Sequence, residues 1–356
     1  MKFHTPREIY FGWESAKNLS KIKKRAVIMT GTNVWKYVQD FIPLNASVYE
    51  MKHAHGEPVE EDVIRAFEFL SEEKPEWIVA IGGGSVIDTA KLAWIWYEQP
   101  KISWREIYEL RIPTLREKAR FAAMETTSGT GTGISAAAVV TDKRGIKHGI
   151  VSQEIIPDMA IYDPDMVMSM PRNTVIYSGM DALTHAIESY VSKVDNIPAD
   201  TMSLKAVELI FNHLKSSLDG DLEARELVHY GNMMAAMGFT NSRLGLCHAA
   251  SHRIGGRYGI EHGKLNAILL PHFIRSTERY TRRYEDIERM LKIEDLAHAI
   301  EELNRDFGIP STLPEIENKI NELAHEIYEE PLMKTNPGNM NVKEIEEFLK
   351  MVAHVA

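Results

Sequence analysis

The amino-acid sequence predicts an α/β domain followed by an all-helical domain. In the first part of the chain, short apolar runs of buried-strand type alternate with segments of helical periodicity, which is the pattern of βαβ units around a parallel sheet. From about Thr174 onward the periodicity is helical and no convincing strand run follows. We therefore expect one domain over residues 1–165 and a second over residues 166–356, divided near the turn signal Asp163-Pro164-Asp165.

The expected elements of the first domain are short, and small residues often end them. Helical spacing of apolar residues predicts helices over 32–40, 59–70 and 86–96, whereas the polar stretch 97–120 reads as loop and short helix. An apolar run at 121–124 precedes a loop of small residues. In the second domain, apolar spacing predicts a helix over 293–307, closed by Gly308. The expected strands occupy residues 9–12, 25–31, 46–50, 77–81, 136–140 and 159–162.

Composition excludes several classes of function. The chain has 356 residues and a net charge of −10, so it lacks the basic footprint of a protein that binds nucleic acid or an anionic membrane. No apolar run approaches the length needed to span a bilayer, and the N-terminus lacks the apolar core of a signal peptide. The single cysteine rules out an internal disulfide and suits a reducing compartment, so we expect a cytoplasmic protein.

Two glycine-rich or hydroxyl-rich loops point to a dinucleotide. Gly82-Gly83-Gly84-Ser85 stands between a strand and a helix, where backbone can approach a phosphate at a helix N-terminus. This turn is not the G-x-G-x-x-G fingerprint, and alone it fits a tight strand–helix turn equally well. The second loop, Thr126–Gly133, favours the dinucleotide, because its flanking apolar runs make a surface linker the poorer explanation.

The end of the second expected strand bears on the choice of cofactor. Sites for NAD commonly place a carboxylate near the adenosine ribose 2′-hydroxyl. The sequence Thr30-Gly31-Thr32-Asn33 offers none, which permits a 2′-phosphate and therefore NADP(H). Glu50, at the end of the next strand, is the alternative source of that carboxylate and would favour NAD(H).

Ligand-type side chains gather in the helical half. Asp181 and His185 are one helical turn apart, as are His248 and His252, so each pair projects from one helix face. His262 follows at a point where the chain could turn back. Each histidine alone fits a buried structural residue, but together they favour a divalent metal held by two helices and a turn. Carboxylate and imidazole ligands suit ferrous iron or zinc.

Taken together, these motifs resemble those of the iron-containing (group III) alcohol dehydrogenases over nearly the whole chain. The resemblance implies a Rossmann-like N-terminal domain and an all-helical C-terminal domain with a cleft between them, as in the dehydroquinate synthase-like architecture. It implies hydride transfer between NADP(H), or alternatively NAD(H), and a primary alcohol or aldehyde at Fe²⁺ or Zn²⁺. The stretches that carry it are Gly82–Asp88, Thr126–Gly131, Gly179–Glu188, His248–His252, His262-Gly263 and Thr335–Pro337.

The resemblance also implies roles for individual residues. His252 would lie beside the metal and relay a proton, with a purely structural role as the alternative. The position of Gly31 often holds aspartate in NAD-using members, which again points to NADP(H). The implied metal ligands are Asp181, His185, His248 and His262. The implied cofactor contacts are Gly31 and Asn33, Gly83, Gly84, Ser85 and Asp88 at the pyrophosphate, Thr126, Thr127 and Thr130, and Lys147 at the nicotinamide-side ribose.

Some positions depart from the family pattern. Glu125 stands where the family often has proline, Gly133 where it often has glutamate, and Glu57 lies near a position that is commonly asparagine. The alternatives are a glycerol or other polyol dehydrogenase of the same superfamily, a metal-dependent hydrolase, and a non-catalytic metal- or nucleotide-binding protein. The expected partners are a small alcohol or aldehyde and a second copy of the chain in a homodimer.

Overall fold

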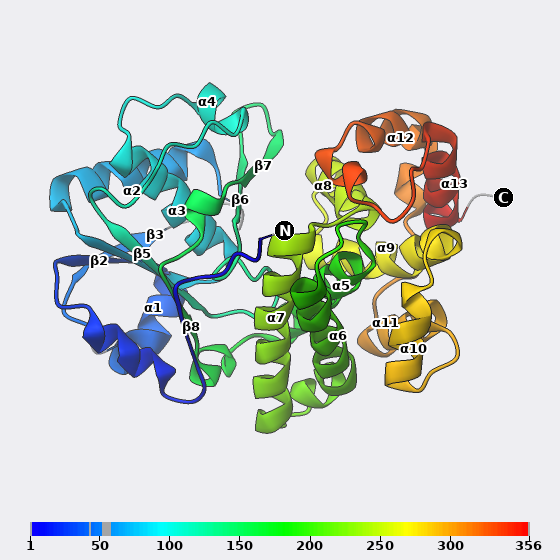
Figure 1. Ribbon diagram of the computed structural model, residues 1–356, viewed down its shortest axis with the longest axis horizontal. Coiled ribbons are helices and arrows are strands. Elements are labelled where there is room, and N and C mark those ends of the chain that lie inside the picture. Colours follow the sequence, from blue (N-terminus) through cyan, green and yellow to red (C-terminus); the bar gives the residue numbers. More distant parts are fainter. Residues whose placement is uncertain (1, 43, 52–57, 355–356) are drawn as a thin grey trace. The chain divides into compact units, whose positions relative to one another are not determined.

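The protein divides into two compact units, described by a computed structural model over residues 2–42, 44–51 and 58–354. The sheet unit comprises His4–Pro171, and the helical unit comprises Met1–Phe3 with Arg172–Ala356. Figure 1 shows the strands in the first unit and helices in the second. The predicted fold class, an α/β domain followed by an all-helical domain, is confirmed.

The main sheet of the sheet unit has six parallel strands in the order β1-β8-β5-β4-β2-β3. Its register aligns Met29, Ala80, Ala123 and Ala160 in one row across four strands. A separate antiparallel ribbon pairs β6 with β7. The strands are β1 (Glu8–Phe11), β2 (Ala26–Gly31), β3 (Ser47–Met51), β4 (Trp77–Gly82), β5 (Arg120–Glu125), β6 (Ala137–Thr141), β7 (Lys147–Val151) and β8 (Met159–Tyr162).

Helices cover both faces of this sheet, which explains its nearly continuous apolar strands. Val27 and Met29 of β2 point to the face covered by α2 (Glu60–Glu73) and α3 (Gly84–Glu98). Ile28 points to the opposite face, which is covered by α1 (Thr32–Val38) and the 3₁₀ helix η1 (Ser15–Lys21). The short helix α4 (Trp104–Tyr108) lies in the stretch expected to be loop and short helix.

The strand order creates a point where ligands commonly bind. The chain passes from β2 to β3 in one direction and then returns to place β4 on the other side of β2. Open parallel sheets bind ligands outside the carboxyl ends of the strands at such a reversal. Thr30 pairs with Ile81, and Gly82 pairs with Glu125, so the ends of β2, β4 and β5 lie side by side. Both loops that point to a dinucleotide leave the sheet at this edge.

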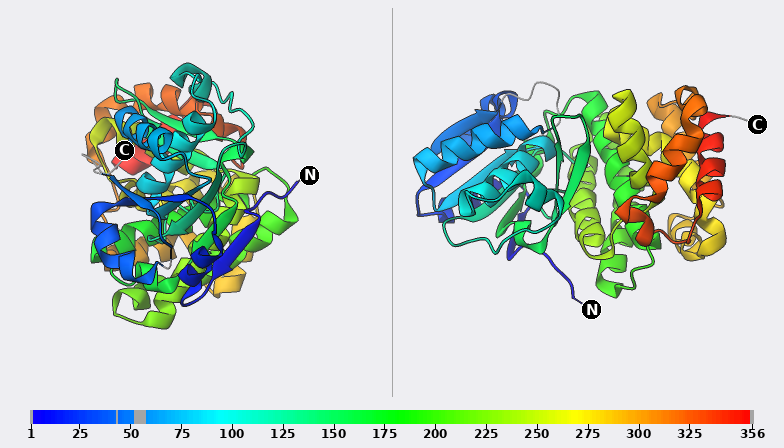
Figure 2. Two further views of the ribbon diagram at one scale, coloured as in Figure 1. Left: turned by 90° about the vertical axis from the view of Figure 1, so that its left-hand side faces the viewer. Right: turned by 90° about the horizontal axis from the view of Figure 1, so that it is seen from above.

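Within its described residues, the helical unit contains nine α-helices and no strand. Figure 2 shows these helices from two further directions. None of the helices in the described part of the chain is long and apolar enough to cross a membrane. The helices are α5 (Arg172–Val191), α6 (Ile197–Leu218), α7 (Leu222–Ser242), α8 (Leu246–Tyr258), α9 (His262–Thr277), α10 (Arg283–Leu291), α11 (Leu296–Phe307), α12 (Ile320–Tyr328) and α13 (Val342–Ala353).

One expected helix boundary needs correction, and two strands lie in segments for which no strand was predicted. The helix expected over 293–307 begins at Leu296, because the Asp295 side chain accepts a hydrogen bond from the His298 N–H and caps it. The apolar run 121–124 is the core of strand β5, and 147–151 forms the strand β7 that the sequence did not predict. In β7 only Ile150 is fully buried, so the segment lacks a clear alternating pattern.

Candidate functional site

The glycine turn after β4 packs directly against the threonine loop after β5. A Cβ atom built on Gly83 would lie 2.9 Å from Cγ2 of Thr127, and one on Gly84 would lie 2.7 Å from Cγ2 of Thr130. Only glycine allows this approach without displacing the threonines. Ser85 lies in the first turn of α3, whose N-terminus carries no side-chain cap. Its leading N–H groups are therefore available to an anion.

The threonine loop contains a buried hydroxyl that suits a ligand. Oγ1 of Thr130 is buried and has no hydrogen-bond partner among the described residues. Thr126, four residues earlier, is buried, while Thr127 is partly exposed. Buried hydroxyls normally have a partner, so an unsatisfied one beside an uncapped helix N-terminus fits a phosphate or ribose oxygen. The residues at this edge therefore fit a dinucleotide.

Asp88 and Lys147 are two further residues that are expected to contact the cofactor. Asp88 is buried, and its two carboxylate oxygens accept hydrogen bonds from Oγ1 of Thr132 at 2.6 Å and from the Val139 N–H at 3.0 Å. Asp88 thus ties α3 to the threonine loop and to β6. Lys147 begins β7 and is partly buried, opposite Thr141 in β6.

The residues that bear on cofactor choice lie at the ends of β2 and β3. Gly31 ends β2 and precedes α1, on which Asn33 is exposed. Glu50 is exposed near the end of β3 and pairs with Thr30 of β2. Glu57 lies outside the described residues.

Two departures from the family pattern are sterically coupled. Glu125 is buried at the end of β5, and its Oε1 accepts a hydrogen bond from the Gly133 N–H at 2.7 Å. A Cβ atom on Gly133 would lie 2.8 Å from Cγ of Glu125. The glutamate at one position therefore requires the small residue at the other.

Burial should make Glu125 a source of pH-dependent stability. Burial raises the pKa of Glu125 from 4.5 to about 8, although the Gly133 N–H and Lys91 oppose the shift. The folded protein then holds a proton that the unfolded chain releases, so stability falls as the pH rises from about 4.5 to about 8. The substitution Glu125→Gln removes the ionisable carboxyl group but keeps a side-chain oxygen that can accept the hydrogen bond from the Gly133 N–H. We expect the variant to be more stable than the parent by roughly 1–3 kcal/mol at pH 8.5 and equally stable near pH 4.5.

Urea unfolding of both proteins across this pH range measures the difference. Glu98→Gln is a matched control, because Glu98 is also buried. Unlike Glu125, Glu98 accepts hydrogen bonds on both carboxylate oxygens, from the backbone N–H groups of residues 117–119. A parallel pH dependence of stability in the Glu125→Gln variant and its parent would contradict the assignment.

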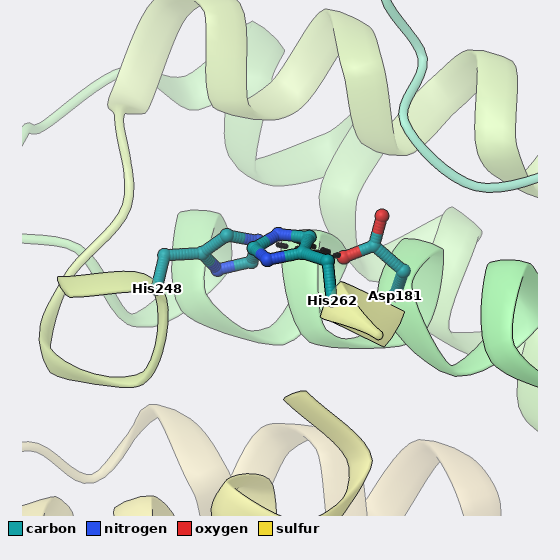
Figure 3. Close-up of side chains that lie close together, drawn as sticks. All are labelled: Asp181, His248 and His262. Carbon is teal, nitrogen blue, oxygen red and sulfur yellow. Dashed lines mark ion pairs between the residues drawn. The ribbon is translucent and has the colours of Figure 1, made fainter. Parts of the chain in front are cut away.

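Three ligand-type side chains converge in the helical unit. Asp181 lies on α5, His248 near the start of α8, and His262 is the first residue of α9. Oδ1 of Asp181 is 3.6 Å from Nε2 of His248 and 3.6 Å from Nε2 of His262. Figure 3 marks these two ion pairs with dashed lines. All three atoms lie within 4.8 Å of one another. A tetrahedral ion with bonds of about 2.1 Å needs ligand atoms roughly 3.4 Å apart, so this group fits a divalent metal.

His185 and His252 lie next to Asp181, His248 and His262, but neither contributes one of the three converging atoms. Nδ1 of His185 is 3.9 Å from Oδ2 of Asp181, and its ring stacks on that of His248 with centroids 4.4 Å apart. The ring of His252 stacks on that of His262 at 5.6 Å. The expected turn at His262 is instead the start of α9, so the five residues come from three helices.

A glycine explains why α5 and α9 can meet at this point. A Cβ atom on Gly263 would lie 2.1 Å from the carbonyl oxygen of Tyr177, which is one turn before Asp181. No side chain fits in that space, so only glycine permits the first turn of α9 to rest on α5. This contact brings His262 against Asp181.

Sequence reasoning missed the residues that orient the histidines. Glu188 is buried on α5, and its carboxylate hydrogen-bonds Nδ1 of His248 while also accepting the Cys247 N–H at 2.8 Å. It therefore caps α8 and turns Nε2 of His248 toward Asp181. The hydroxyl of Ser251 lies 3.0 Å from Nδ1 of His262. Glu188 was detectable in principle, because it lies two helical turns after Asp181 on the same face.

Asn266 is the second residue that the sequence did not reveal. It lies one turn after His262 on α9, and its Nδ2 donates to Oδ1 of Asp181 at 2.7 Å. The same nitrogen is 3.1 Å from Nε2 of His248 and 3.2 Å from Nε2 of His262. Asn266 follows His262 by four residues and therefore lies on the same face of α9. This spacing is the one feature of the sequence that points to its role in the site.

The electrostatics of the group favour a cation. Burial alone would raise the pKa of Asp181, but the imidazoles of His185, His262 and His248 outweigh it and hold that pKa well below its usual range. Burial alone would lower the pKa of His248, yet the neighbouring carboxylates of Asp181 and Glu188 raise it to about 9. The site thus contains a buried carboxylate that stays charged and draws positive charge toward itself.

Comparisons with known proteins cover nearly the whole chain. A family model described as iron-containing alcohol dehydrogenase matches residues 6–164, and one described as the C-terminal part of the Fe-containing alcohol dehydrogenase family matches residues 175–353. The NADPH-dependent butanol dehydrogenase of Clostridium saccharobutylicum is 35% identical over 99% of this chain and 98% of its own. The NAD-dependent methanol dehydrogenase of Bacillus methanolicus is 33% identical over 83% of this chain and 82% of its own.

A solved structure of an iron-containing alcohol dehydrogenase has the same fold as this chain. The iron-containing alcohol dehydrogenase from Thermococcus thioreducens superposes with a TM-score of 0.91 and is 32% identical. The superposition covers 99% of this chain and 100% of that one. The similarity therefore extends over both units.

Proposed function

The chain belongs to the iron-containing alcohol dehydrogenase family, which comprises oxidoreductases acting on alcohols, and we propose that it interconverts a primary alcohol and its aldehyde using NADP(H). The observation that carries this proposal is the convergence of Asp181, His248 and His262 at metal-ligand spacing. The dinucleotide-type loops at the edge of the sheet support it independently, because metal-assisted oxidation of an alcohol also needs a hydride acceptor such as a nicotinamide.

The proposed roles of the metal-site residues follow from their contacts. A divalent ion at this site would supply Lewis acidity to the substrate oxygen, and a nicotinamide would serve as donor or acceptor of the hydride. Asp181, His248 and His262 hold the ion, and His185 is the proposed fourth ligand. Glu188 fixes the ring of His248 so that Nε2 remains the coordinating atom.

His252 is our candidate for moving the hydroxyl proton. Its ring stacks on that of His262 at a centroid distance of 5.6 Å, so it lies beside the ligand group without contributing a converging atom. An imidazole in that position can accept a proton from the alcohol and pass it to water. The oxygen and nitrogen donors suit Fe²⁺ and Zn²⁺ alike, and the family favours iron.

NADP(H) is the preferred cofactor in this proposal because β2 ends without a carboxylate. Gly31 lies at the switch point of the sheet, where the adenosine ribose of a dinucleotide commonly binds. A 2′-phosphate there would meet no negative charge from Gly31. The butanol dehydrogenase relative is NADPH-dependent, whereas the methanol dehydrogenase relative is NAD-dependent, so both cofactors belong in the test.

Gly31→Asp should shift cofactor use toward NADH. The new Cβ would lie 3.7 Å from Cγ2 of Val86, an ordinary contact, and the backbone φ of −86° imposes no strain. The added carboxylate would repel the 2′-phosphate, so the ratio of kcat/KM for NADPH over NADH should fall by about tenfold or more. Gly31→Ser is the control, because it adds similar bulk without charge. An equal effect of serine and aspartate on this ratio would remove charge from the explanation.

An anaerobic assay of the Fe²⁺-loaded protein tests the proposed reaction. It follows the absorbance of NADPH and of NADH with short, long and polyol-derived aldehydes. We expect oxidation of NADPH with a simple primary aldehyde. A preference for glycerol-type substrates would favour the polyol dehydrogenase alternative. No oxidation of either cofactor with any aldehyde, together with no dinucleotide binding, would overturn the proposal in favour of a hydrolase or a binding protein.

A further inference from the structure

Lys91 is completely buried on α3, and its charged end holds the backbone that follows the threonine loop. Its Nζ donates hydrogen bonds to the carbonyl oxygen of Ser135 at 2.7 Å and to that of Ala137 at 3.0 Å. The threonine loop ends at Gly133, and β6 begins at Ala137. Lys91 therefore binds the chain where it passes from the loop into the antiparallel ribbon.

The same helix holds this segment a second time through Asp88. Asp88 precedes Lys91 by three residues, so both side chains lie on one face of α3. The carboxylate of Asp88 accepts hydrogen bonds from Oγ1 of Thr132 at 2.6 Å and from the Val139 N–H at 3.0 Å. Because the lysine binds carbonyl groups and the aspartate binds donors, residues 132–139 are fixed against α3 from both sides of the backbone.

A charged group at this depth has a cost that packing alone does not explain. Burial lowers the pKa of Lys91 to about 8, and the carboxyl groups of Asp88 and Glu125 oppose this shift. Lys91 therefore remains charged at neutral pH, in a space where an apolar side chain of similar size would avoid the loss of hydration. The contribution specific to lysine is its grip on the two carbonyl groups.

The segment held by α3 determines where the threonines of the loop lie. Cβ atoms built on Gly83 and Gly84 would lie 2.9 Å from Thr127 and 2.7 Å from Thr130, so the loop touches the glycine turn without a gap. The first turn of α3 begins at this contact and offers its N–H groups there. The side chains that hold the loop follow on the same helix within about two turns. One helix thus positions both the N–H groups and the threonines.

We propose that Lys91 is a positioning residue for the dinucleotide, which sets the place of the threonine loop relative to the N-terminus of α3. This inference rests on the proposed function, in which this edge of the sheet binds NADP(H). Lys91 acts through the carbonyl groups of Ser135 and Ala137 and does not itself touch the cofactor. Its loss should weaken cofactor binding, while the metal ligands of the helical unit keep their ion.

The test compares Lys91→Met with the parent protein, both loaded with Fe²⁺. Methionine has a similar length but brings neither a charge nor a donor, so the two carbonyl groups lose their partner. We expect the Kd and the KM for NADPH to rise by about tenfold or more, with kcat at saturating NADPH within about twofold of the parent value. Metal content should be unchanged. Titration of NADPH fluorescence measures the Kd without any assay of turnover.

Glu98→Met is the matched control for this experiment. Glu98 is buried on the same helix and also binds backbone, because it accepts the N–H groups of residues 117–119. That segment lies at the opposite end of β5 from the threonine loop. Its loss should lower the melting temperature and leave the Kd for NADPH unchanged. Lys91→Gln keeps a donor and should give an intermediate Kd, and it carries the test if Lys91→Met does not fold.

The outcomes separate this inference from the proposed function. If the parent protein binds neither NADPH nor NADH, the proposed cofactor site is wrong and the inference fails with it. If the parent binds NADPH and the Lys91 variants bind it equally tightly, Lys91 serves stability alone and only this inference is overturned. An equal loss of affinity in Glu98→Met would also overturn it, since general destabilisation would then be the cause. Weaker NADPH binding confined to the Lys91 variants, with kcat retained, supports the proposal.

Discussion

Asp181→Ala should abolish metal retention and lower kcat/KM by at least about 10³-fold. Asp181 is the only one of the three converging residues that brings a negative charge, and Oδ1 is the atom shared by both 3.6 Å separations. Without it, the imidazoles of His185, His248 and His262 remain, and none of these brings the negative charge that offsets the charge of a buried divalent ion. Metal content per chain after gel filtration and the anaerobic aldehyde assay measure the two effects.

Two further variants make this result specific. Asp181→Asn keeps the side-chain volume and should lose metal as the alanine variant does, because the charge is gone. Asp200→Asn is the control, because Asp200 pairs with Arg283 at 3.0 Å on the same helical unit and should affect stability alone. Stoichiometric metal and normal turnover in the Asp181→Ala variant would exclude this residue as a ligand.

Glu188→Gln should weaken metal affinity by about 10–100-fold while leaving the fold intact. Both oxygens of Glu188 are used, because one accepts the Cys247 N–H and the other contacts Nδ1 of His248. Glutamine has a single acceptor, so one of these contacts would become a clash between two donors. The ring of His248 would then lose the partner that keeps Nε2 directed at Asp181.

A metal titration distinguishes positioning from general stabilisation. The Glu188→Gln variant should require more Zn²⁺ for half occupancy and should regain most of its turnover when Zn²⁺ is in excess. Glu330→Gln is the control, since Glu330 is also paired, in this case with Arg253, but does not contact a ligand. A lowered melting temperature with unchanged metal affinity would show that Glu188 serves only to cap α8.

Much of the fold follows from patterns that are local in the sequence. β2 is apolar from Ala26 to Met29 and β4 from Trp77 to Ile81 because helices cover both faces of the sheet, and that continuity is visible without a structure. The helix pairs of ligand-type residues on α5 and α8 follow from the helical repeat in the same way. β7 could not be predicted, since its half-buried residues carry no alternating pattern.

Asn266 and Glu188, which orient the metal ligands, could not be predicted from local patterns in the sequence. Asn266 is one of several asparagines on helices, and only the crossing of α5, α8 and α9 brings its amide to Asp181. Glu188 acquires its role from the position of the start of α8, which belongs to a different part of the chain. Glu125 and Gly133 appeared as two separate departures from the family pattern, and only their contact shows that they compensate each other.

Titration of the stripped protein with Fe²⁺ under anaerobic conditions tests the central claim most directly. The rate of NADPH oxidation with a primary aldehyde is recorded as the metal is added. Our account predicts almost no turnover without metal and a linear rise that ends at one Fe²⁺ per chain. A full rate in the stripped protein, or a rate that is unaffected by Fe²⁺ and Zn²⁺, would contradict it.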